Sequence, residues 1–98
     1  MATDVYKMGA SLDSSNAPEI QKAILAVLDQ EKSIILDMSN CTYVSSAGLR
    51  VMLYSYKIAA AKGNKVYLVG VSDEIRDVMS MTGFEKFFDF FNSVDEVK

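Results

Sequence analysis

The chain has 98 residues, half of them hydrophobic and 23% charged, with a formal net charge of −3. This composition is typical of one globular domain that buries a core without disulfides or metals. The absence of histidine excludes Ser-His-Asp and Cys-His catalysis and imidazole metal ligation. The single cysteine, Cys41, excludes an intramolecular disulfide and a cysteine-rich zinc site. We therefore expect a single domain over residues 1–98 with neither a metal nor a cofactor.

Charge and hydropathy also restrict the partners of the chain. Thirteen acidic residues against ten basic ones argue against a nucleic-acid partner. No run of about 18 apolar residues is present, so we expect no membrane span. The first residues lack the basic and then apolar layout of a signal peptide, which predicts a cytoplasmic protein.

In chain order, the first expected element is a short strand over residues 5–10, followed by a turn. Residues 17–30 carry apolar side chains at the spacing of an amphipathic helix. Pro18 lies in its first turn, where proline is tolerated, and Ser15 or Asn16 is the expected N-cap. The face predicted to be buried consists of Ile20, Ala23, Ile24, Val27 and Leu28.

The middle of the chain predicts a buried strand, a polar loop and a second helix. The apolar run over 33–38 is typical of a strand covered on both faces. The helical period returns over 47–62 and ends at Gly63-Asn64. Its predicted inward stripe consists of Leu49, Met52, Leu53, Tyr56 and Ala60.

The last third predicts a strand over 65–71 and a helix that Ser72 caps and Gly83 ends. We expect a short final strand over 87–91 and the start of a terminal helix over 93–98. The inward residues of the helix are predicted to be Ile75, Val78, Met79 and Thr82, and the core is expected to hold Phe84, Phe87, Phe88, Phe90 and Phe91.

Alternating strands and helices indicate a largely parallel sheet with right-handed crossovers. Sites in such sheets gather beyond the carboxyl ends of the strands. Two segments are expected at that edge, residues 13–16 and residues 37–48.

The sequence Ser45-Ser46-Ala47-Gly48 leads from a loop into the second helix. Unpaired N–H groups and the helix dipole would stabilise an anion there, and either hydroxyl could carry a phosphate. Simple N-capping of the helix by one of the serines explains the same residues. From the residues alone, both interpretations stay open.

Three motifs in register resemble those of STAS domains, the anti-sigma factor antagonists of bacteria. Residues 37–50, Asp-Met-Ser-Asn-Cys-Thr-Tyr-Val-Ser-Ser-Ala-Gly-Leu-Arg, are similar to the family signature. Residues 12–19, Leu-Asp-Ser-Ser-Asn-Ala-Pro-Glu, and residues 81–84, Met-Thr-Gly-Phe, match two further family patterns. The resemblance implies a four- to five-stranded, mostly parallel sheet with three to four helices packed mainly on one face.

The resemblance also implies a switch without catalysis. Unphosphorylated members bind an anti-sigma factor that is also a serine kinase. This binding makes the anti-sigma factor release its client. Phosphorylation of one serine breaks the complex, and a metal-dependent serine phosphatase restores it. Alignment on Gly48 places that serine at Ser46 rather than Ser45. The implied partner-binding residues are Asp13, Ser15, Ser45, Ser46, Ala47, Gly48 and Arg50.

Purely structural roles explain several of these residues as well. Asp13 is equally well explained as a turn-forming residue, and Arg50 as a solvated helix charge. Asp37 and Ser39 are expected to order their loop, and Cys41 to be an inert core residue. The family's usual extra first strand is shortened or absent here, which would expose a sheet edge and leaves self-association open.

Three other functions compete with the switch. The first is a constitutive STAS scaffold or accessory subunit that has no phosphoswitch. A nucleotide-binding domain is disfavoured because the chain has no Gly-x-x-x-x-Gly-Lys loop. A hydrolase is weaker still, because no base is placed to activate either serine.

Overall fold

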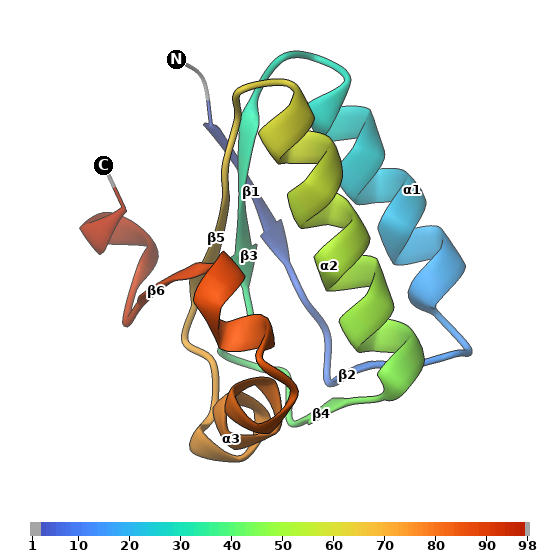
Figure 1. Ribbon diagram of the computed structural model, residues 1–98, viewed down its shortest axis with the longest axis vertical. Helices are drawn as coiled ribbons and strands as arrows, with labels where there is room; N and C mark the ends of the chain where they lie inside the picture. Colours follow the sequence, from blue (N-terminus) through green and yellow to red (C-terminus); the bar gives the residue numbers. More distant parts are fainter. Residues whose placement is uncertain (1–2, 98) are drawn as a thin grey trace.

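The computed structural model describes residues 3–97. Within this range the chain forms three α-helices, two parallel sheets and two short 3₁₀ helices (Figure 1). The elements are β1 (Thr3–Lys7), β2 (Ser11–Leu12), α1 (Ala17–Leu28), β3 (Ser33–Asp37), β4 (Tyr43–Val44), α2 (Ser46–Ala61), β5 (Val66–Val69), α3 (Asp73–Thr82), η1 (Phe84–Phe87), β6 (Asp89–Phe91) and η2 (Val94–Glu96).

The main sheet has the strand order β1-β3-β5-β6, and every neighbouring pair in it is parallel. Helices α1 and α2 lie side by side on one face of this sheet, and α3 lies beyond the carboxyl ends of the strands (Figure 1). This arrangement confirms the predicted mixed α/β fold with a mostly parallel sheet. Its physical basis is the continuously buried β3, of which Ile34 and Leu36 are fully inaccessible.

The sequence analysis missed a second, two-stranded sheet formed by β2 and β4. The Thr42 N–H donates to the Ala10 carbonyl at 2.9 Å, and the Ser45 N–H donates to the Leu12 carbonyl at 2.9 Å. Strands of two residues carry no periodic pattern, so only the contact between distant segments reveals them. The first strand was also misplaced, because β1 ends at Lys7 and not at residue 10.

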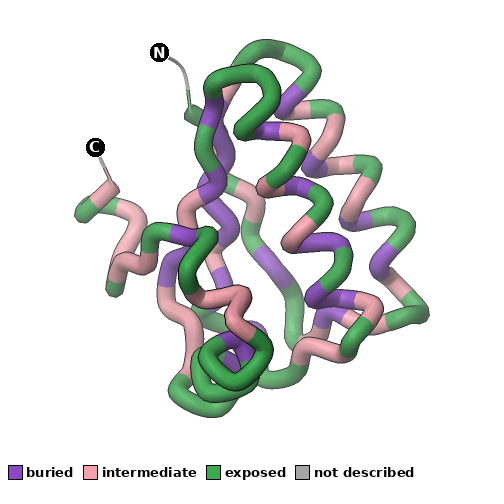
Figure 2. Tube along the Cα trace, viewed as in Figure 1, coloured by how far each residue is buried: buried purple, intermediate pink, exposed green. Residues whose placement is uncertain are grey.

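The predicted inward faces of the helices are correct for α1 and only partly correct for α2 and α3. On α1, Ile20, Ile24 and Leu28 are buried, and Ala23 and Val27 are half-buried. Figure 2 shows buried positions recurring along the helices. On α2, Ala60 is exposed and Ala59 is buried instead. The buried arc of α2 is turned because this helix contacts α1 as well as the sheet. The inaccessible core consists mainly of Met8, Leu12, Ile24, Leu28, Ile34, Leu36, Met38, Met52, Leu68 and Met79.

On α3 the prediction of four inward residues is wrong at two positions. Ile75 and Met79 are buried, whereas Val78 and Thr82 are exposed. Because α3 lies at the end of the sheet and not across its face, one row of side chains is enough to pack it. Both predicted ends are confirmed: Ser72 accepts a hydrogen bond from the Ile75 N–H, and Gly83 adopts the left-handed conformation that ends the helix.

The predicted phenylalanine core is also only partly correct. Phe88 is buried, but Phe87 is 44% exposed and stacks on Tyr56 with ring centroids 5.2 Å apart. The final strand is shorter than predicted, because residues 84–87 form the helical turn η1. At the C-terminus, residues 94–96 form one 3₁₀ turn, and the predicted helix is therefore absent up to residue 97.

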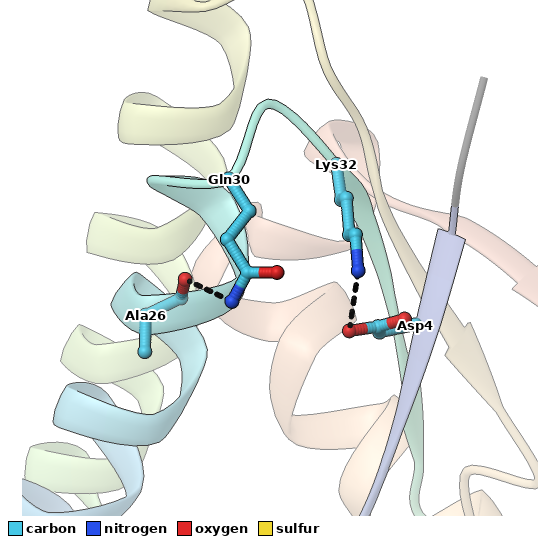
Figure 3. A network of polar contacts seen from close by, with 4 residues as sticks. All are labelled: Asp4, Ala26, Gln30 and Lys32. Carbon is cyan, nitrogen blue, oxygen red and sulfur yellow. Dashed lines mark hydrogen bonds and ion pairs between the residues drawn. The ribbon is translucent and has the colours of Figure 1, made fainter.

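Polar contacts near the amino ends of β1 and β3 are superficial (Figure 3). Lys32 Nζ lies 3.5 Å from Asp4 Oδ2, and Gln30 Nε2 donates to the Ala26 carbonyl at 3.1 Å. The Lys32–Asp4 pair is only partly buried, and a pair near the surface contributes about 0–1 kcal/mol. Strand β1 is therefore held chiefly by its backbone pairing with β3, and it forms one edge of the sheet.

Candidate functional site

The short β2–β4 sheet brings the two predicted site segments together at the carboxyl edge. Strand β2 leads into the turn of Asp13, and parallel β4 leads into Ser45 and α2. The register pairs Leu12 with Val44, so the residues that follow each strand emerge side by side. The candidate site is therefore a surface made by two loops and the first turn of α2 (Figure 1).

Asp13 organises the turn before α1. Ser11 Oγ donates to its Oδ2 at 2.9 Å, the Ser15 N–H donates to its Oδ1 at 2.9 Å, and the Ser15 hydroxyl donates to the same oxygen. These hydroxyls, that of Ser15 first, lower the pKa of Asp13, so the carboxylate is ionised at neutral pH. Since both oxygens accept bonds from the chain itself, Asp13 holds Ser15 in place at the exposed edge.

Sequence reasoning did not predict the role of the Asn16 side chain in this turn. Its Oδ1 accepts a bond from the Asp13 N–H at 2.9 Å, and its Nδ2 donates to the Ser11 carbonyl at 2.9 Å. Asn16 is the N-cap residue of α1, as predicted, but its side chain makes no capping bond to the helix. The one sequence signal for these two hydrogen bonds is the Leu-Asp-x-x-Asn spacing of residues 12–16.

The structure separates the roles of the two serines. Ser45 is the N-cap of α2, and its Oγ accepts a hydrogen bond from the Gly48 N–H at 3.2 Å. Ser46 is the first residue of the helix and is exposed. A phosphate on the exposed Ser46 would leave the Ser45 cap unchanged, whereas a phosphate on Ser45 would modify the capping oxygen itself.

The remaining residues of the predicted surface differ in accessibility. Arg50 is exposed and Ala47 is half-buried, so both are accessible to a partner. Gly48 is buried, and a Cβ there would lie 2.5 Å from the Leu12 carbonyl oxygen. This glycine allows α2 to approach β2, and any contribution that it makes to a partner surface is therefore indirect.

A second ordered turn follows β3 near the same edge. The Ser39 hydroxyl donates to Asp37 Oδ1 at 2.6 Å, and the Ser39 N–H donates to the same oxygen at 3.1 Å. These bonds are the main reason that the pKa of Asp37 is lowered. Gly70 packs against this turn, since a Cβ at position 70 would lie 2.9 Å from Ser39 Cβ. Asp37 thus orders the loop, as predicted.

The chemistry available at the site is limited to hydroxyls and exposed charge. Cys41 is 2% exposed, and its burial raises the pKa of the thiol, which makes it an inert core residue as predicted. In the part of the chain that the structure describes, no three histidine, cysteine, aspartate or glutamate residues are grouped to hold a metal ion. No helix among residues 3–97 is long and apolar enough to cross a membrane.

We predict that Ser45→Ala destabilises the domain by about 1 kcal/mol, because the Gly48 N–H loses its side-chain acceptor. In a domain of this size such a loss lowers the Tm by about 4–8 °C. Ser46→Ala should leave the Tm within about 2 °C of wild type, because the exposed Ser46 hydroxyl caps nothing. Differential scanning calorimetry of both variants checks this, and equal Tm values would contradict the assignment of the cap.

The sequence comparison establishes the family. The family model described as STAS domain matches residues 3–97, and the chain therefore belongs to the STAS domain family. This confirms the resemblance carried by the three motifs.

Individual relatives agree with the family. The chain is 31% identical to a Bordetella bronchiseptica protein provisionally named anti-sigma factor antagonist BtrV, over 84% of this chain and 72% of that protein. It is 28% identical to an anti-sigma-B factor antagonist of Staphylococcus aureus, over 81% and 74% of the two chains. The fold matches the anti-sigma factor antagonist SpoIIAA of Bacillus in its unphosphorylated form, with a TM-score of 0.73, 19% identity and coverage of 94% and 81%.

Proposed function

We propose that the protein is a cytoplasmic anti-sigma factor antagonist, a binding protein that phosphorylation of Ser46 switches off. The unphosphorylated domain binds an anti-sigma factor that is also a serine kinase, and it thereby releases the client of that factor. A metal-dependent serine phosphatase reverses the modification. The names of the relatives support the antagonist role. The single observation that carries the site is that Ser46 is exposed at the first position of α2, beside Ser45, the residue that caps this helix.

The geometry supports a switch that acts through charge. Phosphoserine adds about −1.5 to −2 charges near neutral pH. Inside the domain this charge lies at a helix N-terminus, which tolerates an anion, so the fold should persist. In an interface that buries the neutral hydroxyl, an unpaired dianion costs several kcal/mol. Since about 1.4 kcal/mol is tenfold in affinity, such a cost is large enough to separate the complex.

A neighbour in the same fold provides a precedent. SpoIIAA of Bacillus has been solved in an unphosphorylated and in a phosphorylated form, and the two match this chain with the same TM-score of 0.73. The equal scores are consistent with a modification that leaves the fold in place. We carry the modification over to this chain because the Ser-Ser-Ala-Gly-Leu-Arg sequence stands at the start of α2.

Phosphorylation mapping tests this function. Wild type, Ser45→Ala and Ser46→Ala are each incubated with ATP and the anti-sigma factor kinases encoded in the source genome, and phosphopeptides are identified by mass spectrometry. We expect a phosphate on Ser46 in wild type and in Ser45→Ala, and no phosphate in Ser46→Ala. A phosphate found on Ser45 alone would show that the regulatory site is the N-cap residue and not Ser46. If wild type binds the anti-sigma factor but acquires no phosphate, a constitutive STAS scaffold is favoured.

A further inference from the structure

We propose that the groove between α1 and α2 is the docking site for an amphipathic helix of the anti-sigma factor that carries an acidic residue at its margin. The proposal rests on the proposed function and deepens it, because it names a second part of the same partner surface. The groove is open and has a volume of about 730 Å³. Its walls are formed by the two helices that lie side by side in Figure 1.

The groove is continuous with the proposed switch. At one end it is lined by Ala47, the neighbour of Ser46, and by Pro18 in the first turn of α1. Farther along it is lined by Leu25 of α1 and Tyr54 of α2. A partner that covers Ser46 therefore meets the groove without a break.

The lining of the groove is suited to an apolar ligand. Tyr54 is 44% exposed although it lies beside half-buried Leu25, so an aromatic ring and an aliphatic side chain face solvent together. Tyrosines in such positions are frequent anchors of interfaces because they bury a large area with little loss of side-chain entropy. The apolar floor between the two helices gives a reason for a partner to bind there.

The charges at the margins select an acidic partner. Lys22 on α1 and Arg50 on α2 line opposite walls, and both are exposed. Among the residues that the structure describes, neither forms an ion pair within the chain. Among the described residues that line the groove, Glu19 is the single acid beside Lys22 and Arg50, so this lining is net positive in a protein whose net charge is −3. Electrostatic complementarity therefore favours a carboxylate on the ligand.

The backbone of the two helices that form the groove favours a helical ligand over an extended peptide. Both walls are α-helices, whose N–H and C=O groups bond within each helix, so the groove offers no strand edge to an extended peptide. A helix satisfies its own backbone and needs only side-chain contacts, as in other helix-in-groove complexes. The 12 residues of α1 span about 18 Å, enough to contact roughly three turns of a bound helix.

Arg50 connects this groove to the switch. Ser46 and Arg50 are four residues apart on α2, a spacing that places their side chains on one face of the helix. A phosphate on Ser46 would place negative charge on the same helix face as Arg50, would offset the positive charge of the groove margin there and would repel the acidic residue of the partner. Phosphorylation would thereby weaken docking in the groove as well as contact with the serine itself.

The test measures the affinity of the full chain for the purified anti-sigma factors of the source genome, for wild type and for single variants. Tyr54→Ala should weaken binding by about tenfold or more. Arg50→Gln should weaken it several-fold and reduce its salt dependence, and Arg50→Glu should weaken it further. Two matched controls should bind within about twofold of wild type. Met81→Ala removes a 79% exposed apolar side chain on α3, and Lys57→Gln removes a positive charge on α2 outside the groove.

The outcomes separate this inference from the switch. If Tyr54→Ala and Arg50→Gln bind like the controls while Ser46→Asp does not bind, the groove is not the docking site and the proposed function stands. If the groove variants lose affinity while Ser46→Asp and Ser46→Ala bind alike, docking in the groove is supported and regulation by phosphorylation of Ser46 is contradicted. Tighter binding by Arg50→Glu would show a basic ligand and overturn the proposal. Failure of wild type to bind any of these factors would overturn both.

Discussion

Replacing Ser46 by aspartate is expected to weaken binding to the anti-sigma factor by at least about tenfold relative to Ser46→Ala, without unfolding the domain. The hydroxyl is exposed at the first turn of α2, where a partner that covers it must remove it from water. Desolvating a carboxylate is far more costly than desolvating a methyl group. Isothermal titration calorimetry with the purified factor measures the difference.

Thermal unfolding provides the control for this prediction. An acid in the first turn of a helix stabilises it by about 0.3–1 kcal/mol through the helix dipole. The Tm of Ser46→Asp should therefore equal or slightly exceed that of Ser46→Ala. Loss of binding together with a Tm that is lower by several degrees would attribute the effect to misfolding. Equal affinities of the two variants would instead favour a constitutive scaffold that has no switch.

Gly48→Ala is expected to destabilise the domain by about 1–3 kcal/mol. The new Cβ would lie 2.5 Å from the Leu12 carbonyl oxygen and 2.8 Å from Leu12 Cγ. Both contacts are too short, and the carbonyl also accepts the Ser45 N–H of the β2–β4 sheet. Relief therefore requires α2 to move away from β2, which separates the two site loops.

Gly9→Ala is the matched control, since a Cβ at position 9 would have no neighbour within 4 Å among residues 3–97 and no positive φ is required there. Chemical denaturation of the two variants should give a clearly lower free energy of unfolding for Gly48→Ala only. The same variant should also bind the anti-sigma factor more weakly, because the Asp13 turn and Ser46 lose their common support. Equal stability of the two variants would show that α2 can shift without cost.

The local features of the fold were predictable because they depend on residues within a few positions of one another. The spacing of Ile20, Ile24 and Leu28 predicted the buried side of α1, and Ser72 and Gly83 predicted both ends of α3. The prediction failed at Ala60, Val78 and Phe87, which are exposed. Their burial depends on the position of each element relative to the others, and helical periodicity does not contain that information.

For the candidate site, the sequence alone determined the class of residues and the edge of the sheet at which they gather. The strand-helix alternation predicted a largely parallel sheet covered by helices, and the three motifs, through their resemblance to the family, predicted the STAS fold. The sequence also placed two serines at the start of a helix, but it left open which of them caps it.

Only the tertiary structure decided how these residues share their roles. The pairing of Ser11-Leu12 with Tyr43-Val44 joins segments about 30 residues apart and positions Asp13 beside α2. That contact places Ser45 at the cap, leaves Ser46 exposed and explains why position 48 is a glycine. The groove beside them likewise exists only because α1 and α2 pack side by side. Such long-range contacts depend on the whole fold, and no local pattern encodes them.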